Sequence, residues 1–422
     1  MILVTIAAGF SWFDGSTLPL WIAGTAAWLA AILLFVDTSR VLKVQVLLIL
    51  LAGLAMLVYA SSRGPLVDPA MIIGSNTGLM TMIAAVGFLR LVMLPSAKTS
   101  ERLPVGRKAF LQTIAGLNIS SSIINISAPI LIADRIHEQR PLQRFTAQTF
   151  VRIFCGVSSW SPFFGAMAVV LTYVSEASLM WIMLAGFPFM LVGFAGVYLE
   201  ARLRYADDVD AFVGYPTHLS ALAVPALLIV TVIAITRGIP DLPILMSIAV
   251  GALLVTLVTA LYRFGGRETV TRVLDYCSSG LARIVNELCL FLAAGVLAAG
   301  IAALVQLGLL QNPFTEFDGV TAATVLAIML GCALCGIHPI IMISSFAPMI
   351  MTLDPDPNLL AATFLFAWHI GTCSNPLSGT NLVFQGRYGI SSWRLALWNW
   401  PYALTMLAVG ALWLQLVARL LP

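Results

Sequence analysis

Residues 156–170 read GVSSWSPFFGAMAVV, and residues 370–384 read IGTCSNPLSGTNLVF. When Pro162 is aligned with Pro376, Gly165 falls on Gly379, and a run of small polar residues precedes each proline. Proline cannot continue the hydrogen bonding of a helix, and small polar side chains compete for its backbone groups. Each stretch therefore predicts a helix that is broken near its proline.

Two further pairs of stretches match in the same order along the chain. NISAPILIADR at 125–135 aligns with ISSFAPMIMTLD at 343–354 through an Ala-Pro step. More weakly, SNTGLMTMIAAVGF at 75–88 aligns with VNELCLFLAAGVLA at 285–298. Three landmarks in one order indicate an internal duplication, with halves at 1–210 and 211–422.

The composition places the chain in a membrane. Apolar residues make up 60% of it and charged residues only 10%, whereas about 25% charged residues is usual for a soluble domain. Such a chain cannot cover itself in water, so we expect an all-α, multi-pass protein of the bacterial cytoplasmic (inner) membrane. The apolar stretches long enough to span are 17–36, 42–61, 70–95, 177–200, 217–236, 240–262, 284–308, 318–336 and 391–420.

The charges around the polar segments predict their orientation. Basic residues lie on both sides of 107–133, so the positive-inside rule predicts a re-entrant hairpin that enters and leaves on the cytoplasmic side. Acidic residues flank the second region, and no Lys or Arg occurs from 284 to 386. We therefore expect the hairpin at 336–353 to enter from outside. With the broken helices at 146–174 and 358–386, this predicts two inverted-topology repeats.

The polar hairpin tips and helix breaks are the candidate binding site. Broken backbone at membrane depth frees carbonyl groups for a cation and helix N-termini for an anion. The predicted substrate-binding residues are Asn118, Ser120, Ser121, Ser122, Ser159, Ser161, His338, Ser374, Asn375, Ser378, Thr380 and Asn381. The predicted sodium-binding residues are Ser121, Asn125, Gly156, Ser158, Gly336, Ser344, Gly371 and Thr372.

Each of these residues also has a plainer interpretation. Serine, threonine and asparagine often bond only to backbone or across helices in membranes. His338 can hold substrate, titrate as a proton coupler, or cap the break, and His369 is a weaker candidate of the same kind. Arg152 can balance an anionic substrate or snorkel toward the interface.

Several classes of function are excluded by missing motifs. The chain has no GxxxxGK[ST] loop for ATP and no basic cluster with interleaved aromatic residues for nucleic acid. A membrane-embedded enzyme would need acid, base or metal ligands inside the membrane, and the apolar spans contain no HExxH, no paired aspartates and no serine–histidine–acid set. We expect a protein that is not an enzyme and that needs no cofactor beyond a coupling sodium ion.

The two hairpins, the broken helices and the order of the landmarks resemble the ion transporter superfamily over residues 70–420. That superfamily includes the divalent anion:sodium symporters and the large membrane subunits of TRAP transporters. The resemblance implies a homodimeric carrier with an elevator mechanism. The divalent anion symporters carry Ser-Asn-Thr at both tips, and neither tip here has that motif.

Together these observations predict a secondary active transporter of a small organic or inorganic anion, carboxylate-like and sodium-coupled. Residues 107–174 and 336–386 would move, while the other helices would form the scaffold and the dimer contact in the lipid. One alternative is a proton-coupled antiporter or exporter with His338 as the titrating group. Another is the large subunit of a TRAP-like transporter that needs a soluble binding protein.

Overall fold

A computed structural model describes residues 18–64, 67–93, 103–215 and 223–420 of the chain. Within these ranges the regular structure is helical, apart from one bridge between Val105 and Val213. Within these same ranges, six helical segments are long and apolar enough to cross a membrane: Leu20–Asp37, Arg40–Ser61, Leu179–Arg204, Ile244–Gly280, Val285–Gln306 and Ser392–Leu420. The chain therefore has the helix content and composition of a multi-pass membrane protein.

One expected span is wrong in detail. The stretch 70–95 was predicted as a continuous helix, but it contains three short ones, α4 (Pro69–Ile73), α5 (Thr77–Gly87) and α6 (Arg90–Met93). Asn76 interrupts the chain between α4 and α5 because its φ of 62° is left-handed. Asparagine tolerates this conformation better than most residues, so a polar residue in an apolar run ends the helix.

The helices pack into two compact units. Unit 1 comprises 1–94, 224–315 and 343–354, and unit 2 comprises 95–223, 316–342 and 355–422. Each unit takes segments from both predicted halves. The inverted duplication itself stays a prediction.

Unit 1 is built around two long helices that lie side by side. These are α3 (Arg40–Ser61) and α15 (Val285–Gln306), which pack along each other. The other helices of unit 1 are α2 (Leu18–Leu34), α4, α5, α6, α13 (Ala223–Gly238) and α14 (Ile244–Asp275). Glycines allow this close approach, because a Cβ on Gly53 would come within 2.7 Å of the Leu297 backbone.

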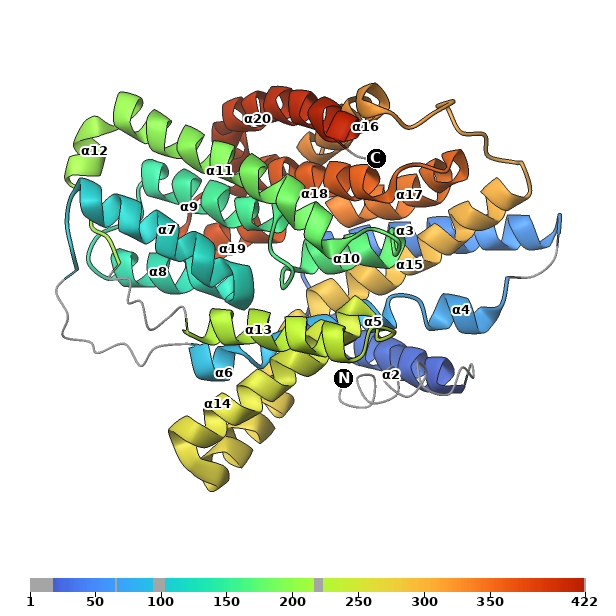
Figure 1. Cartoon of the computed structure of the whole chain (residues 1–422), viewed down its shortest axis with the longest axis horizontal. Helices are drawn as coiled ribbons and strands as arrows, with labels where there is room; N and C mark the ends of the chain where they lie inside the picture. The colour runs from blue at the N-terminus through green and yellow to red at the C-terminus, as the bar shows by residue number, and fades with distance from the viewer. Residues whose placement is uncertain (1–17, 65–66, 94–102, 216–222, 421–422) are drawn as a thin grey trace. The chain divides into compact units, whose positions relative to one another are not determined.

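Helix α14 contains a sharp kink. Gly265 has φ 76° and ψ 173°, which is not helical, and glycine adopts this conformation without steric cost. Figure 1 shows the chain doubling back near this point. The kink separates the apolar span from the amphipathic stretch 266–275.

Unit 2 holds most of the predicted site. Its helices are α7 (Arg107–Ile124), α8 (Ser127–His137), α9 (Arg144–Gly156), α10 (Gly165–Tyr173), α11 (Leu179–Arg204), α12 (Ala206–Asp210), α16 (Gly319–Leu334), α18 (Pro357–Ser374), α19 (Gly379–Tyr388) and α20 (Ser392–Leu420). Helix α17 (Pro339–Ile350) begins in this unit and continues into unit 1. Helix α18 is buried along nearly its whole length, since α9, α10, α11, α16 and α20 surround it (Figure 1).

The chain enters and leaves the first segment of unit 2 at one place. The Gly106 amide donates to the Phe212 carbonyl at 2.9 Å, and the Gly214 amide donates to the Pro104 carbonyl at 2.8 Å. These two segments, 104–106 and 212–214, form a clasp, and an ion pair between Arg107 and Asp210 lies beside it. The carboxylate accepts a second hydrogen bond from Arg107 Nη2 at 2.9 Å.

Candidate functional site

The first helix break joins α9 to α10. Helix α9 ends at Gly156, a 3-10 turn covers Val157–Ser159, and α10 begins at Gly165. Pro162 therefore lies in the interruption, as its position in the sequence predicts. The backbone of the break has no spare room, because a Cβ on Gly186 of α11 would lie 1.7 Å from the Ser159 carbonyl oxygen.

The serines of this first break are fully buried, and two of them bond to other elements. Ser158 Oγ donates to the Cys155 carbonyl of its own helix at 2.7 Å. Ser159 Oγ lies 2.8 Å from His369 Nδ1 on α18. Ser161 Oγ donates to the Ser122 carbonyl on α7 at 2.7 Å. The first break is thus tied to the hairpin and to the central helix.

The predicted tip of hairpin one is misplaced by about one helical turn. Residues Asn118 to Ser122 lie inside α7, and the chain turns at Asn125, whose φ is 54°. The polar run stays helical, and its last serine bonds within the helix, since Ser122 Oγ donates to Ile119 O at 2.7 Å. Asn118 Nδ2 donates across to the Ile153 carbonyl at 3.2 Å. Ser120 is half-buried.

The second break joins α18 to α19 and is held mainly by its own residues. Ser374 Oγ donates to Ile370 O at 2.6 Å, and Ser378 caps α19 by accepting from the Asn381 amide at 3.3 Å. Asn381 Nδ2 donates to the carbonyls of Cys373 and Asn375 at 3.3 and 2.9 Å. Thr380, which precedes Asn381 in the chain, also has a buried side chain.

The second tip lies where helix α16 ends. Gly336 has φ 92°, and the amide of Ile337 donates to the Cys332 carbonyl, which completes a Schellman cap. Asn375 Nδ2 reaches this tip and donates to the Ile337 carbonyl at 2.9 Å. The structure thus brings the second tip and the second break together.

His338 at this tip has a capping contact. Its Nδ1 accepts a hydrogen bond from the Ile340 amide at 3.2 Å, and its ring stands edge-on to Trp368 with centroids 5.4 Å apart. The cap is one of the three roles expected for this residue, and the binding and titrating roles stay untested.

The predicted hairpin at 336–353 contains the turn and only one α-helix, α17, followed by a short 3-10 turn at Met351–Leu353. Ser344 lies on the part of α17 that belongs to unit 1, so it is not grouped with the other site residues in unit 2. Gly371 faces α16, because a Cβ there would come within 3.1 Å of Ala333 Cβ.

Three buried oxygen atoms of the predicted site have no hydrogen-bond partner among the described residues. They are Ser121 Oγ, Thr372 Oγ1 and Asn381 Oδ1. Hydroxyl and amide oxygens are ligands that hard cations accept. No cluster of three or more His, Cys, Asp or Glu side chains occurs in the described part of the chain. Ser121 Oγ, Thr372 Oγ1 and Asn381 Oδ1 are therefore oxygens of the kind that hard cations accept.

A buried arginine network lies beside both breaks. Arg152, one turn before the first break, is 3% exposed and forms an ion pair with Glu200 of α11. Its Nε donates to Asn399 Oδ1 at 2.8 Å, and Asn399 Nδ2 donates to the Cys373 carbonyl next to the second break at 3.1 Å. Arg152 is therefore held inside unit 2 by a counter-ion and does not snorkel. Asn399 was missed because 391–420 was treated as a plain apolar span.

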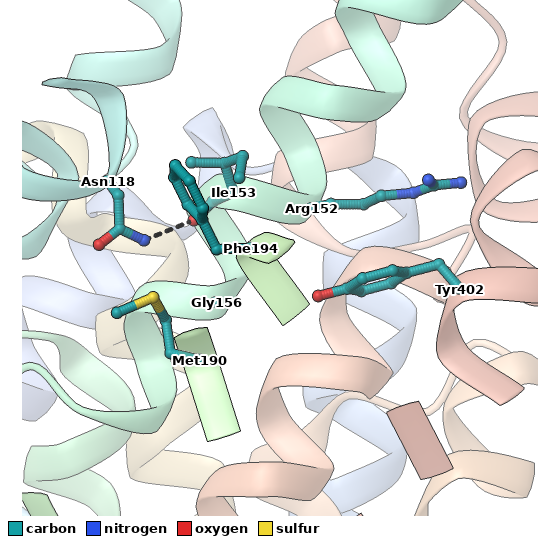
Figure 2. A pocket seen from close by; sticks show the side chains of 7 residues that line it. All are labelled: Asn118, Arg152, Ile153, Gly156, Met190, Phe194 and Tyr402. Carbon is teal, nitrogen blue, oxygen red and sulfur yellow. Dashed lines mark hydrogen bonds between the residues drawn. The ribbon is translucent and has the colours of Figure 1, made fainter. Parts of the chain in front are cut away.

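Figure 2 shows a narrow pocket next to the first break. It has no space for a water molecule in this conformation. The lining residues are Asn118, Arg152, Ile153, Gly156, Met190, Phe194 and Tyr402. The Tyr402 hydroxyl points toward Gly156 and Asn118, whereas the Arg152 guanidinium points away from them (Figure 2). Binding a solute here requires a wider state.

The fold is shared with a solved transporter. The chain is similar to the Alcanivorax borkumensis YdaH transporter, whose crystal structure is described as having an unusual topology, with a TM-score of 0.52 and 16% sequence identity. The match covers 88% of this chain and 97% of the other. At this identity the likeness establishes the fold only. No protein-family model matches the sequence, and no curated protein matches it significantly.

Proposed function

We propose that this chain is a secondary active transporter that moves a small, carboxylate-like anion across the bacterial inner membrane, coupled to sodium. The observation that carries this proposal is the meeting of two broken helices in unit 2. Ser159 of the first break bonds to α18, and α18 leads directly into the second break. The fold shared with a transporter supports the same class of function.

In the proposed site, hydroxyl and amide groups would hold the anion. Arg152 is neutralised by Glu200, so its charge is not free for substrate in this conformation. The helices α10 and α19 begin at the two breaks, and their N-termini carry partial positive charge. The unpartnered oxygens Ser121 Oγ, Thr372 Oγ1 and Asn381 Oδ1 would be available to sodium.

We further propose that unit 2 moves as a body in an elevator mechanism and that unit 1 forms the scaffold of a homodimer. This assignment extends the moving part beyond 107–174 and 336–386. Helices α11 and α20 join it, because Glu200 and Asn399 both bond to Arg152 of α9. Buried hydrogen-bonded groups of this kind resist separation.

The test is uptake of radiolabelled succinate, citrate, phosphate and sulfate into proteoliposomes under an inward sodium gradient. At limiting substrate, Ser159→Ala and Asn375→Ala should each lower the initial rate about tenfold, the effect of losing about 1.4 kcal/mol of binding. Thr324→Ala is the matched control, because this exposed hydroxyl bonds only within α16. Unchanged uptake by both site variants would refute the site. Equal uptake after choline replaces sodium would refute sodium coupling and favour the proton-coupled alternative.

A further inference from the structure

His369 bonds through both ring nitrogens to residues on two other elements. Its Nδ1 lies 2.8 Å from Ser159 Oγ at the first break. Its Nε2 lies 2.9 Å from Tyr402 Oη on α20. The imidazole is 1% exposed, and Phe189 of α11 stands edge-on to it with ring centroids 5.4 Å apart. The three residues form one hydrogen-bonded chain through the interior of unit 2.

A neutral imidazole has one N–H donor and one acceptor nitrogen, so this chain can run in two directions. In the first, Tyr402 donates to Nε2, Nδ1 donates to Ser159 Oγ, and Ser159 donates to the Gly156 carbonyl at 3.1 Å. In the second, Ser159 donates to Nδ1 and Nε2 donates to Tyr402 Oη. The Tyr402 hydroxyl then no longer donates to the imidazole, so its proton is available to another acceptor.

The two directions offer different ligands at the first break. In the second direction the Ser159 oxygen keeps both lone pairs, and the Gly156 carbonyl loses its hydrogen bond from Ser159. Two oxygen ligands for a hard cation thus become available together. At the other end, the Tyr402 hydroxyl points into the pocket beside Gly156 (Figure 2). A cation at one end therefore favours a hydrogen-bond donor at the other.

We infer that His369 is a positioning residue whose tautomer links cation binding at Ser159 and Gly156 to hydrogen-bond donation by Tyr402 into the pocket. The inference rests on the proposed function and deepens it, because one hydrogen-bonded chain through His369 would contact both the sodium ion and the anion. Sodium at the first break turns the Tyr402 hydroxyl into a donor for an anionic oxygen. The two states hold the same number of protons: the ring proton lies on Nδ1 in the first and on Nε2 in the second, and the imidazole is neutral in both.

The surroundings of this chain fit the inference. A Cβ on Gly193 of α11 would lie 2.6 Å from Tyr402 Oη, so a glycine is required for the hydroxyl to reach its position. The Arg152 guanidinium lies over the Tyr402 ring, 5.1 Å from the centroid, and is neutralised by Glu200. The ring and its hydroxyl are therefore fixed from two sides.

The direct test is ¹⁵N NMR of histidine-labelled protein in nanodiscs, in sodium chloride and in choline chloride. We expect the protonated and unprotonated nitrogen signals of His369 to exchange between the two salts, and Tyr402→Phe to abolish the exchange. His338 is an internal control, because its Nδ1 accepts from the Ile340 amide and its tautomer should not change. The signals of His369 are assigned by their loss in His369→Gln. The same His369 tautomer in both salts would overturn the inference.

A second test uses sodium alone as the probe in thermal-shift titrations. Ser159→Ala and Tyr402→Phe should each raise the sodium midpoint about threefold, and their effects should be non-additive although the two residues do not touch. Gly193→Ala should act like Tyr402→Phe, and Gly196→Ala should not, because nothing lies within 4 Å of its added Cβ. If Ser159→Ala lowers uptake about tenfold as proposed but the two effects on the sodium midpoint are strictly additive, the inference is overturned and the proposed function stands. No sodium response in the parent protein, with no uptake of any anion, would overturn the proposed function as well.

Discussion

The two helix breaks of unit 2 look alike in sequence but are held in different ways. At the first, Ser159 and Ser161 bond to residues on α18 and α7, and α11 closes on the backbone through Gly186. At the second, Ser374, Ser378 and Asn381 bond mostly to the break's own carbonyls and amides. The first break is therefore shaped mainly by its neighbours, whereas the second is held mainly by its own hydrogen bonds, with Asn375 and Asn399 adding one bond each to another element. Variants placed outside the breaks should separate the two cases.

The largest effect on stability is expected from Arg152→Ala, because Arg152 lies one turn before the first break and is linked through Asn399 to the second. Its removal leaves Glu200 without its buried partner and Asn399 Oδ1 without a donor. Breaking such a pair costs about 3 kcal/mol. Chemical unfolding in detergent measures this loss. Arg204→Ala is the control, since Arg204 shares Glu200 at 3.7 Å but is 71% exposed, and it should cost about 0.5 kcal/mol or less.

Gly186→Ala should destabilise the protein by about 2 kcal/mol, because the new methyl group overlaps the Ser159 carbonyl and the backbone must shift. Two glycines with nothing within 4 Å of an added Cβ serve as controls, Gly196 on the same helix and Gly379 at the second break. In thermal unfolding, the melting temperature of Gly186→Ala should be well below those of the other two alanine variants. If Gly379→Ala is equally damaging, the contrast between the breaks is wrong.

Ser378→Ala should cost about 1 kcal/mol, the usual value of an N-cap hydrogen bond. The corresponding helix at the first break, α10, has Phe164 at its N-cap and no side-chain cap. Phe164→Leu should therefore leave the N-terminus of α10 no less capped than before. Unfolding and uptake should be measured on both variants. Full stability of Ser378→Ala with lost uptake would mean that Ser378 binds a ligand and does not act as a cap.

The smallest effect is expected at the clasp, far along the chain from either break. Arg107 accounts for most of the lowering of the Asp210 pKa from its ordinary value, through a side-chain hydrogen bond and its charge. Because the folded-state pKa is the lower one, the stabilisation is complete above the unfolded pKa, near 3.8, and is lost as pH falls through the folded value. Melting temperatures of the parent protein and Asp210→Asn should differ slightly at pH 7 and converge in acid. A gap that persists below both pKa values would contradict the ion-pair explanation.

The sequence located both breaks because their signals are local. Pro162 and Pro376 cannot take part in helical hydrogen bonding, and the small polar residues before them mark the interruption. The first tip was misplaced because Asn118 to Ser122 are compatible with either a turn or a helix, and Ser122 satisfies itself within α7. The residue at the turn is Asn125, about one helical turn after this run.

The network around Arg152 depends on contacts that no local pattern encodes. Arg152 and Glu200 are 48 positions apart, and Asn399 and Tyr402 lie in a third segment. A signal was nevertheless present, because Asn399 sits in an apolar helix two residues before Pro401. Polar side chains inside membrane helices are rare enough to deserve a functional hypothesis by default. Its partners still required the folded structure.

The clasp between 104–106 and 212–214 has a consequence for protein engineering. Its two segments are hydrogen-bonded neighbours, so α7 through α12 form a loop of chain whose two ends lie together. The entropy of closing this loop is already lost in the native fold. A covalent link between residues 104 and 214 would therefore join neighbours and need only a short linker.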